Sequence, residues 1–141
     1  IFRWPVLSFV FRHSRAIPIA PAKEDPKMME AAFTEVSKAL AAGELVGLFP
    51  EGKITADGEL CPFRPGITRI LDATPVPVVP LALRGLWGSM FSRKDGPALS
   101  RPLRRGLFSR IELIAGSALA PETVSIPGLQ LQVAELRGDW K

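Results

Sequence analysis

The clearest pattern of apolar positions lies between residues 25 and 43. Four apolar side chains recur there at spacings of three and four residues, as on one face of an α-helix: Met29, Phe33, Val36 and Leu40. Asp25 suits the N-cap position, and Pro26 suits the first helical residue, where a missing N–H is harmless. Gly43 favours the left-handed conformation that ends many helices. The pattern predicts a helix that begins at Pro26 and ends before Gly43.

Shorter apolar runs on both sides of this helix are typical of strands. Five segments are predicted to be strands or extended segments: 16–21, 44–49, 59–63, 76–83 and 110–116. We expect 44–49 to be a buried strand, and the prolines in 76–83 indicate an edge or bulged strand. Further helices are predicted at 6–13, 67–73 and 128–138. Because the helix after Asp25 lies between two extended segments, a βαβ crossover is favoured, and the alternation predicts an α/β fold with a mixed, mostly parallel sheet flanked by helices.

The composition is that of a globular protein. The 141 residues are 47% hydrophobic and 23% charged, and we expect a single domain spanning residues 1–141. The one cysteine, Cys61, excludes an internal disulfide and a cluster of cysteines for zinc. The apolar run 1–11 is too short to span a bilayer. Because the sequence begins at Ile1 and shows no signal-peptide cleavage site, we interpret its start as an internal cut in a longer protein.

The charge balance points to an anionic partner. The formal net charge is +4 and the isoelectric point about 9.7. Such a protein is attracted to nucleic acid, to a membrane surface or to a phosphorylated substrate, and charge alone does not choose among them.

Residues 48–58, LFPEGKITADG, place charged groups directly after an apolar run. In open α/β sheets, ligands bind beyond the carboxyl ends of strands. Gly52 allows a sharp turn and a close backbone approach, and Lys53 is a point charge suited to phosphate. Arg64 is a second cation that can converge on the same anion, while Glu51 can orient a base or a substrate hydroxyl. The alternative is a solvated turn with a weak surface ion pair.

This stretch resembles the third motif of the glycerophospholipid acyltransferase superfamily, in its 1-acylglycerol-3-phosphate acyltransferase group. The family pattern is Phe-Pro-Glu-Gly-Thr-Arg-Ser, a turn and then Phe-Lys-x-Gly, and this chain has FPEGKIT and FRPG. VPVVPLAL resembles the fourth motif and AIPIAPAKED the second, in the family's order, over about residues 1–90. The resemblance implies a glycerol-3-phosphate acyltransferase-like fold. It also implies transfer of a fatty acyl group from acyl-CoA or acyl carrier protein to a lysoglycerophospholipid, as in bacterial enzymes of phospholipid biosynthesis or remodelling.

The resemblance also assigns residues. It places five around the phosphate of the acceptor: Glu51, Gly52, Lys53, Arg64 and Lys23. Lys53 stands one position before the family's phosphate-binding arginine, and Lys23 is the nearest substitute for the arginine of the second motif. The family's general base is the histidine of a His-x-x-x-x-Asp pair. The single histidine, His13, has Pro18 at that spacing, so no catalytic residue is expected in this chain and the pair is expected upstream of Ile1.

A basic segment follows the fourth motif. Its cations are Arg93, Lys94, Arg101, Arg104, Arg105 and Arg110, with apolar neighbours at 86–91. Cations with apolar anchors suit an anionic membrane surface, and the alternative is a solvated basic loop. No nucleic-acid-binding signature is found. We expect an enzyme at the cytoplasmic face of the inner membrane, peripheral or fused to a membrane module, without metal or bound cofactor. The alternative is a non-catalytic basic module that binds anionic membrane or nucleic acid.

Overall fold

The computed structural model describes residues 15–21, 24–53, 55–87 and 110–139. The chain divides into two compact units, Ile1–Val46 and Gly47–Lys141. The two units are taken separately below, and the single domain expected over the whole chain stays a prediction. The helix predicted at 6–13 lies outside the described residues.

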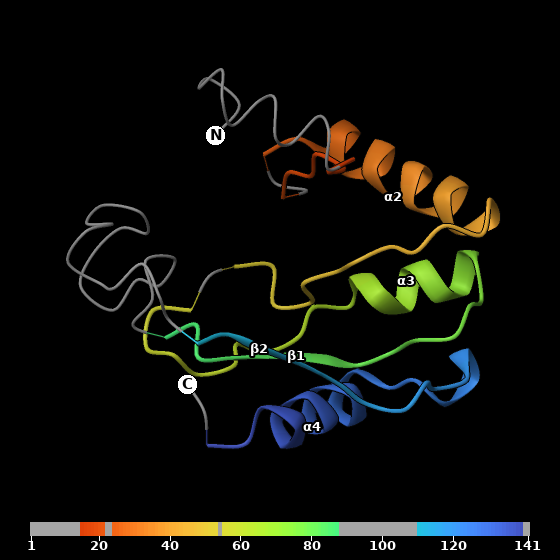
Figure 1. Cartoon of the computed structure of the whole chain (residues 1–141). Coiled ribbons are helices and arrows are strands. Elements are labelled where there is room, and N and C mark those ends of the chain that lie inside the picture. Colours follow the sequence, from red (N-terminus) through yellow and green to blue (C-terminus); the bar gives the residue numbers. More distant parts are fainter. Residues whose placement is uncertain (1–14, 22–23, 54, 88–109, 140–141) are drawn as a thin grey trace. The chain divides into compact units, whose positions relative to one another are not determined.

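The first unit contains the helix that the apolar pattern predicts. Helix α2 spans Pro26–Ala41, and Pro26 occupies the first turn (Figure 1). The Asp25 carboxylate accepts a hydrogen bond from the Met28 N–H at 2.9 Å, which satisfies one of the free N–H groups at the start of the helix. Gly43 has a φ of +77° just beyond the end. The predicted start, cap and stop of this helix are confirmed.

The buried strand predicted at 44–49 is wrong. These residues have no regular secondary structure, Leu45 is fully exposed and Phe49 is 74% exposed. A strand needs a hydrogen-bonded neighbour, whereas here the Glu44 N–H bonds back to the Ala39 carbonyl at the end of α2. The boundary between the two units also falls inside this segment. The βαβ crossover that depended on this strand is therefore not found in the described residues.

The second unit contains a two-stranded antiparallel sheet within the described residues. Strand β1 (Leu81–Arg84) pairs with β2 (Glu112–Ala115), so that Leu81 faces Ala115 and Arg84 faces Glu112. Before β1 begins, Val78 forms one isolated antiparallel bridge with Leu119. The strand predicted at 110–116 is confirmed, and the one at 76–83 starts later, after its second proline. The α/β class holds, but a mostly parallel sheet is not confirmed.

Two helices and a short 3-10 turn complete the second unit. Helix α3 spans Gly66–Ala73, the 3-10 turn spans Pro121–Thr123, and α4 spans Ile126–Arg137. The helices predicted at 67–73 and 128–138 are thus confirmed, and α4 starts two residues early. Figure 1 shows α4 packed along the β1–β2 ladder, with α3 on the other side.

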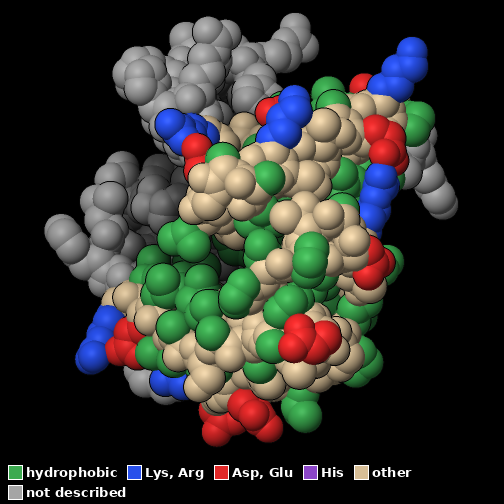
Figure 2. Space-filling model, turned by 90° about the vertical axis from the view of Figure 1, so that its right-hand side faces the viewer, with side chains coloured by type: hydrophobic (Ala, Val, Ile, Leu, Met, Phe, Trp, Pro, Cys, Tyr) green, Lys and Arg blue, Asp and Glu red, His purple; other side chains and the backbone are tan. Residues whose placement is uncertain are grey.

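The two faces of the β1–β2 ladder differ in burial. On the face toward α4, Ala82 is 3% exposed, and the Arg84 side chain donates to the Leu136 carbonyl at 2.8 Å. On the opposite face, Leu83 is 39% exposed and Leu113 is 61% exposed. Hydrophobic side chains are also visible on the face of the molecule that Figure 2 shows. Leu129 of α4, at 4% exposure, is in the small core that fixes the helix to the sheet.

Candidate functional site

The motif loop, residues 51–64, folds back on its own beginning. The Gly52 N–H donates to the Phe49 carbonyl at 3.1 Å, and this closes a tight turn. The Arg64 N–H donates to the Pro50 carbonyl at 2.9 Å. The two bonds bring Gly52 and Arg64, twelve residues apart in the sequence, to the same place.

Arg64 lies across Gly52. A Cβ atom added at Gly52 would stand 3.1 Å from both Cδ and Nε of Arg64 and 3.5 Å from its Cζ. Gly52 also has a φ of +64°, a conformation that L-residues rarely adopt. Glycine is therefore needed twice at this position, for the backbone conformation and for the close approach of the guanidinium.

The two cations of the loop are exposed. Neither Lys53 nor Arg64 forms an ion pair with any carboxylate in the part of the chain that the structure describes. An exposed guanidinium over a glycine turn, with a lysine next in sequence to that turn, supplies several hydrogen-bond donors. Such a group of donors is suited to an anion such as a phosphate.

Glu51 is half-buried and connects the two sides of the loop. One of its carboxylate oxygens accepts a hydrogen bond from the Cys61 N–H at 2.6 Å. A charge-assisted bond of this kind is among the stronger ones in proteins. The family resemblance implies a place for Glu51 around the acceptor phosphate, and its observed bond also makes it a brace within the loop.

The tip of the motif loop is a compact polar turn. The Thr55 hydroxyl donates to the Asp57 carboxylate at 2.7 Å and accepts from the Gly58 N–H at 3.2 Å. Gly58 has a φ of +85°, and the ring of Trp87 covers it so closely that an added Cβ would lie 2.8 Å from a ring carbon. Buried backbone and local hydrogen bonds thus define the tip.

Two residues of α4 hold the loop from outside, and the sequence analysis missed both. The Gln130 amide oxygen accepts from the Phe63 N–H at 3.1 Å. Arg137 donates to the Gly58 carbonyl and to the Glu59 carboxylate, both at 2.9 Å. One signal was available: two residues seven apart on a helix share a face. Nothing in the sequence showed that this face meets the loop.

Comparisons with known proteins support the family resemblance that the motif loop shows. The family model for acyltransferases matches residues 1–84, which include the whole motif loop. The chain belongs to the glycerophospholipid acyltransferase superfamily. The resemblance seen in the motifs is thereby confirmed, and the family supports acyl transfer in lipid synthesis. No solved structure matches this chain significantly.

One curated acyltransferase shows how much of such an enzyme this chain covers. The chain is 31% identical over 96 residues to the 1-acyl-sn-glycerol-3-phosphate acyltransferase BAT2, chloroplastic, of Brassica napus. The alignment covers 68% of this chain and 27% of the relative. The chain thus spans about a quarter of the length of the acyltransferase that it matches.

Several residues that the sequence analysis discussed lie outside the described part of the chain. Lys23 and His13 lie outside the described residues, as does the basic segment up to Arg105. Arg110, which is described, pairs with Glu112 at 2.8 Å. The structure therefore brings together Glu51, Gly52 and Arg64, with Lys53 next to them in sequence.

The described residues show neither a metal-binding cluster nor a membrane-spanning helix. No cluster of three or more histidine, cysteine or acidic side chains there is arranged to hold a metal ion. No helix among those residues is both long and apolar enough to cross a membrane.

Proposed function

We propose that the protein transfers a fatty acyl group from acyl-CoA or acyl carrier protein to a hydroxyl of a lysoglycerophospholipid, and that the motif loop binds the phosphate of this acceptor. The observation that supports the proposal is the guanidinium of Arg64 lying 3.1 Å from the Cβ position of Gly52, in a loop whose cations are exposed. The relative in Brassica napus is named for an acceptor that carries a phosphate.

In the proposed reaction, the acceptor hydroxyl attacks the carbonyl carbon of the thioester. A general base takes the hydroxyl proton, the new ester C–O bond forms, and the C–S bond breaks so that the thiolate leaves. This base lies outside the 141 residues in our proposal, because His13 has Pro18 where the family has aspartate. The residues of the loop hold the acceptor still, and such positioning lowers the entropic barrier to attack.

The acceptor is a membrane lipid, so the proposal places the enzyme at an anionic membrane surface on the cytoplasmic side. The basic residues between Arg93 and Arg110 supply cations for that surface, each contributing about 1 kcal/mol near anionic lipid. No metal ion or bound cofactor is needed, since the thioester supplies the activated acyl group.

The test is acyl transfer by the full-length protein carrying Arg64→Ala, with lysophosphatidic acid as acceptor. We expect the KM for the acceptor to rise about tenfold, because a charge-assisted hydrogen bond contributes roughly 1.5–3 kcal/mol. Lys38→Ala is the matched control: it removes one exposed positive charge that pairs with Glu35 in α2, and we expect it to leave the KM unchanged. An unchanged KM in Arg64→Ala would refute the assignment of the loop.

The alternative function is a basic module that docks on anionic membrane or nucleic acid without catalysis. It predicts binding that weakens steeply with salt and does not depend on Glu51. The acyltransferase function predicts the opposite result. Glu51→Ala abolishes most turnover, because the hydrogen bond to the Cys61 N–H is lost, while binding to anionic vesicles survives. The family match and the close approach of Arg64 to Gly52 favour the enzyme.

A further inference from the structure

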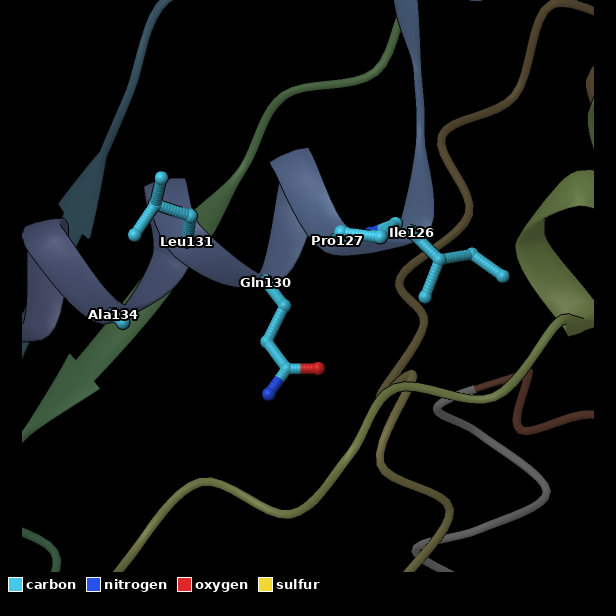
Figure 3. Close-up of a pocket in the computed structure, with 5 residues that line it drawn as sticks. All are labelled: Ile126, Pro127, Gln130, Leu131 and Ala134. Carbon is cyan, nitrogen blue, oxygen red and sulfur yellow. The ribbon is translucent and has the colours of Figure 1, made fainter.

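Helix α4 holds the motif loop at two places. At one place, the Gln130 amide accepts from the N–H of Phe63, the residue before Arg64, at 3.1 Å. At the other, Arg137 bonds to Gly58 and Glu59 at the tip, both at 2.9 Å. Figure 3 shows the Gln130 amide extending from α4 beside an open, apolar groove that Ile126, Pro127, Gln130, Leu131 and Ala134 line.

The spacing of the two residues fits their task. Gln130 and Arg137 are seven residues apart, which is two helical turns on one face and about 10 Å along the axis. One helix face therefore reaches the tip of the loop and the stretch before Arg64 at once. A rigid helix that holds both points fixes the distance between them.

The helix itself is firmly attached. Ser125 caps its start by accepting from the Gly128 N–H at 3.2 Å, and Leu129 is buried in the core. At its other end, Arg84 of β1 donates to the Leu136 carbonyl at 2.8 Å. Helix α4 is thus held by the sheet and the core as well as by its bonds to the loop.

Two groups in these contacts, Phe63 and the Arg137 side chain, are largely shielded from water, whereas the Glu59 side chain is 48% exposed. Phe63 is 8% exposed, so its N–H has little access to a replacement partner in solvent. The Arg137 side chain is 18% exposed, and Glu59 offsets its charge. Arg64 and Lys53, by contrast, are exposed and depend on the loop backbone for their position.

We propose that Gln130 and Arg137 are positioning residues for the acceptor phosphate, which they influence only by holding Phe63 and the loop tip. The proposal rests on the proposed function, and it extends the site beyond residues 1–84, the part that the family model matches. A displacement of about 1 Å in a positioning group can lower a rate by about a hundredfold, so a helix without any contact to substrate can control binding.

The experiment measures acyl transfer to lysophosphatidic acid by the full-length protein with Gln130→Met, which keeps the side-chain volume and removes the acceptor oxygen. We expect the KM for the acceptor to rise about fivefold, with the KM for the acyl donor unchanged. Gln130→Glu keeps the acceptor oxygen and restores the KM to within about twofold. Gln132→Ala, on the same helix, is the control and leaves both KM values unchanged.

Two further variants separate the possible outcomes. Adding Gln130→Met to Arg64→Ala gives no further rise in KM if Gln130 acts through Arg64, because the two effects are then not additive. Arg137→Lys keeps the charge but not the two-armed bridge, and we expect it to raise the acceptor KM about threefold. It tests the proposal even if Gln130→Met does not fold.

The result that overturns the proposal is an unchanged acceptor KM in both Gln130→Met and Arg137→Lys while Arg64→Ala raises it. A lower melting temperature with equal changes in all kinetic constants would also overturn it, since the role would then be structural only. If Arg64→Ala itself has no effect, the proposed function fails instead, and the two failures are distinct.

Discussion

At the scale of single residues, Gly52 and Arg64 define the loop. The chemistry at Gly52 was predictable, because Pro-Glu-Gly-Lys after an apolar run indicates a sharp turn with a cation. Arg64 was expected only to converge with Lys53 on one anion. In the structure its side chain lies across Gly52, with Nε 3.1 Å from where an added Cβ would stand. The contribution of Glu51 to bracing the loop was not predictable, since it depends on where Cys61 lies.

Gly52→Ala tests this residue directly. An alanine at this position must adopt the positive φ of Gly52, which costs an L-residue about 1–2 kcal/mol. Its Cβ also pushes the Arg64 side chain away. We expect urea unfolding to show a loss of about 1–2 kcal/mol and acyl-transfer assays to show a raised acceptor KM.

Gly47→Ala is the matched control for that variant. A Cβ at Gly47 meets no atom within 4 Å, and its φ is not positive. Alanine at such a position leaves stability unchanged or raises it by about 0.4–1 kcal/mol. Equal losses in the two variants would show that the conformation of Gly52 is unimportant.

At the scale of elements, helices were predictable and strands were less so. Asp25, Pro26 and Gly43 determine the limits of α2 through local interactions, which the sequence displays directly. A strand depends on a partner that is distant in sequence. The segment 44–49 has the composition of a strand but pairs with no strand in the described part of the chain, whereas β1 is paired with β2.

The cap of α2 supplies a second prediction. Asp25→Ala removes the acceptor of the Met28 N–H, a bond of 2.9 Å, and we expect it to destabilise the protein by about 1 kcal/mol. Asp25→Ser retains a capping oxygen and should lose less than half of that. Urea unfolding followed by circular dichroism measures both, and equal stabilities of Asp25→Ala and the unchanged protein would contradict the cap.

At the scale of the whole molecule, the family match ends at residue 84, whereas the second folded unit continues to Lys141. The match ends at Arg84, the last residue of β1, although this strand is paired with β2 and packed on α4. Strand β2 and helix α4 both follow the matched region. So do Gln130 and Arg137, the two side chains that hold the loop. A motif search could not find them, because they act by position and not by a shared chemical pattern.

Two cut points in the full-length protein test this arrangement. A protein ended after Arg84 lacks β2 and α4, so β1 has a bare edge and the loop lacks Gln130 and Arg137. We expect it to lack cooperative unfolding and acyl transfer. A protein ended after Asp139 keeps the end of α4 and its cap at Gly138, and it should unfold cooperatively. Cooperative unfolding of the shorter protein would refute the role of α4.

The hydrogen bond from Arg137 to the Gly58 carbonyl joins residues 79 positions apart, so the two partners are synthesised at different times. Ribosomes add about 5–20 residues per second, so Gly58 is synthesised about 4–16 s before the residue that holds it. During that interval the nascent chain carries the complete acyltransferase motif but not the helix that shapes it. The capacity to bind the acceptor should therefore arise late in synthesis, when α4 is complete, and not when the motif itself is made.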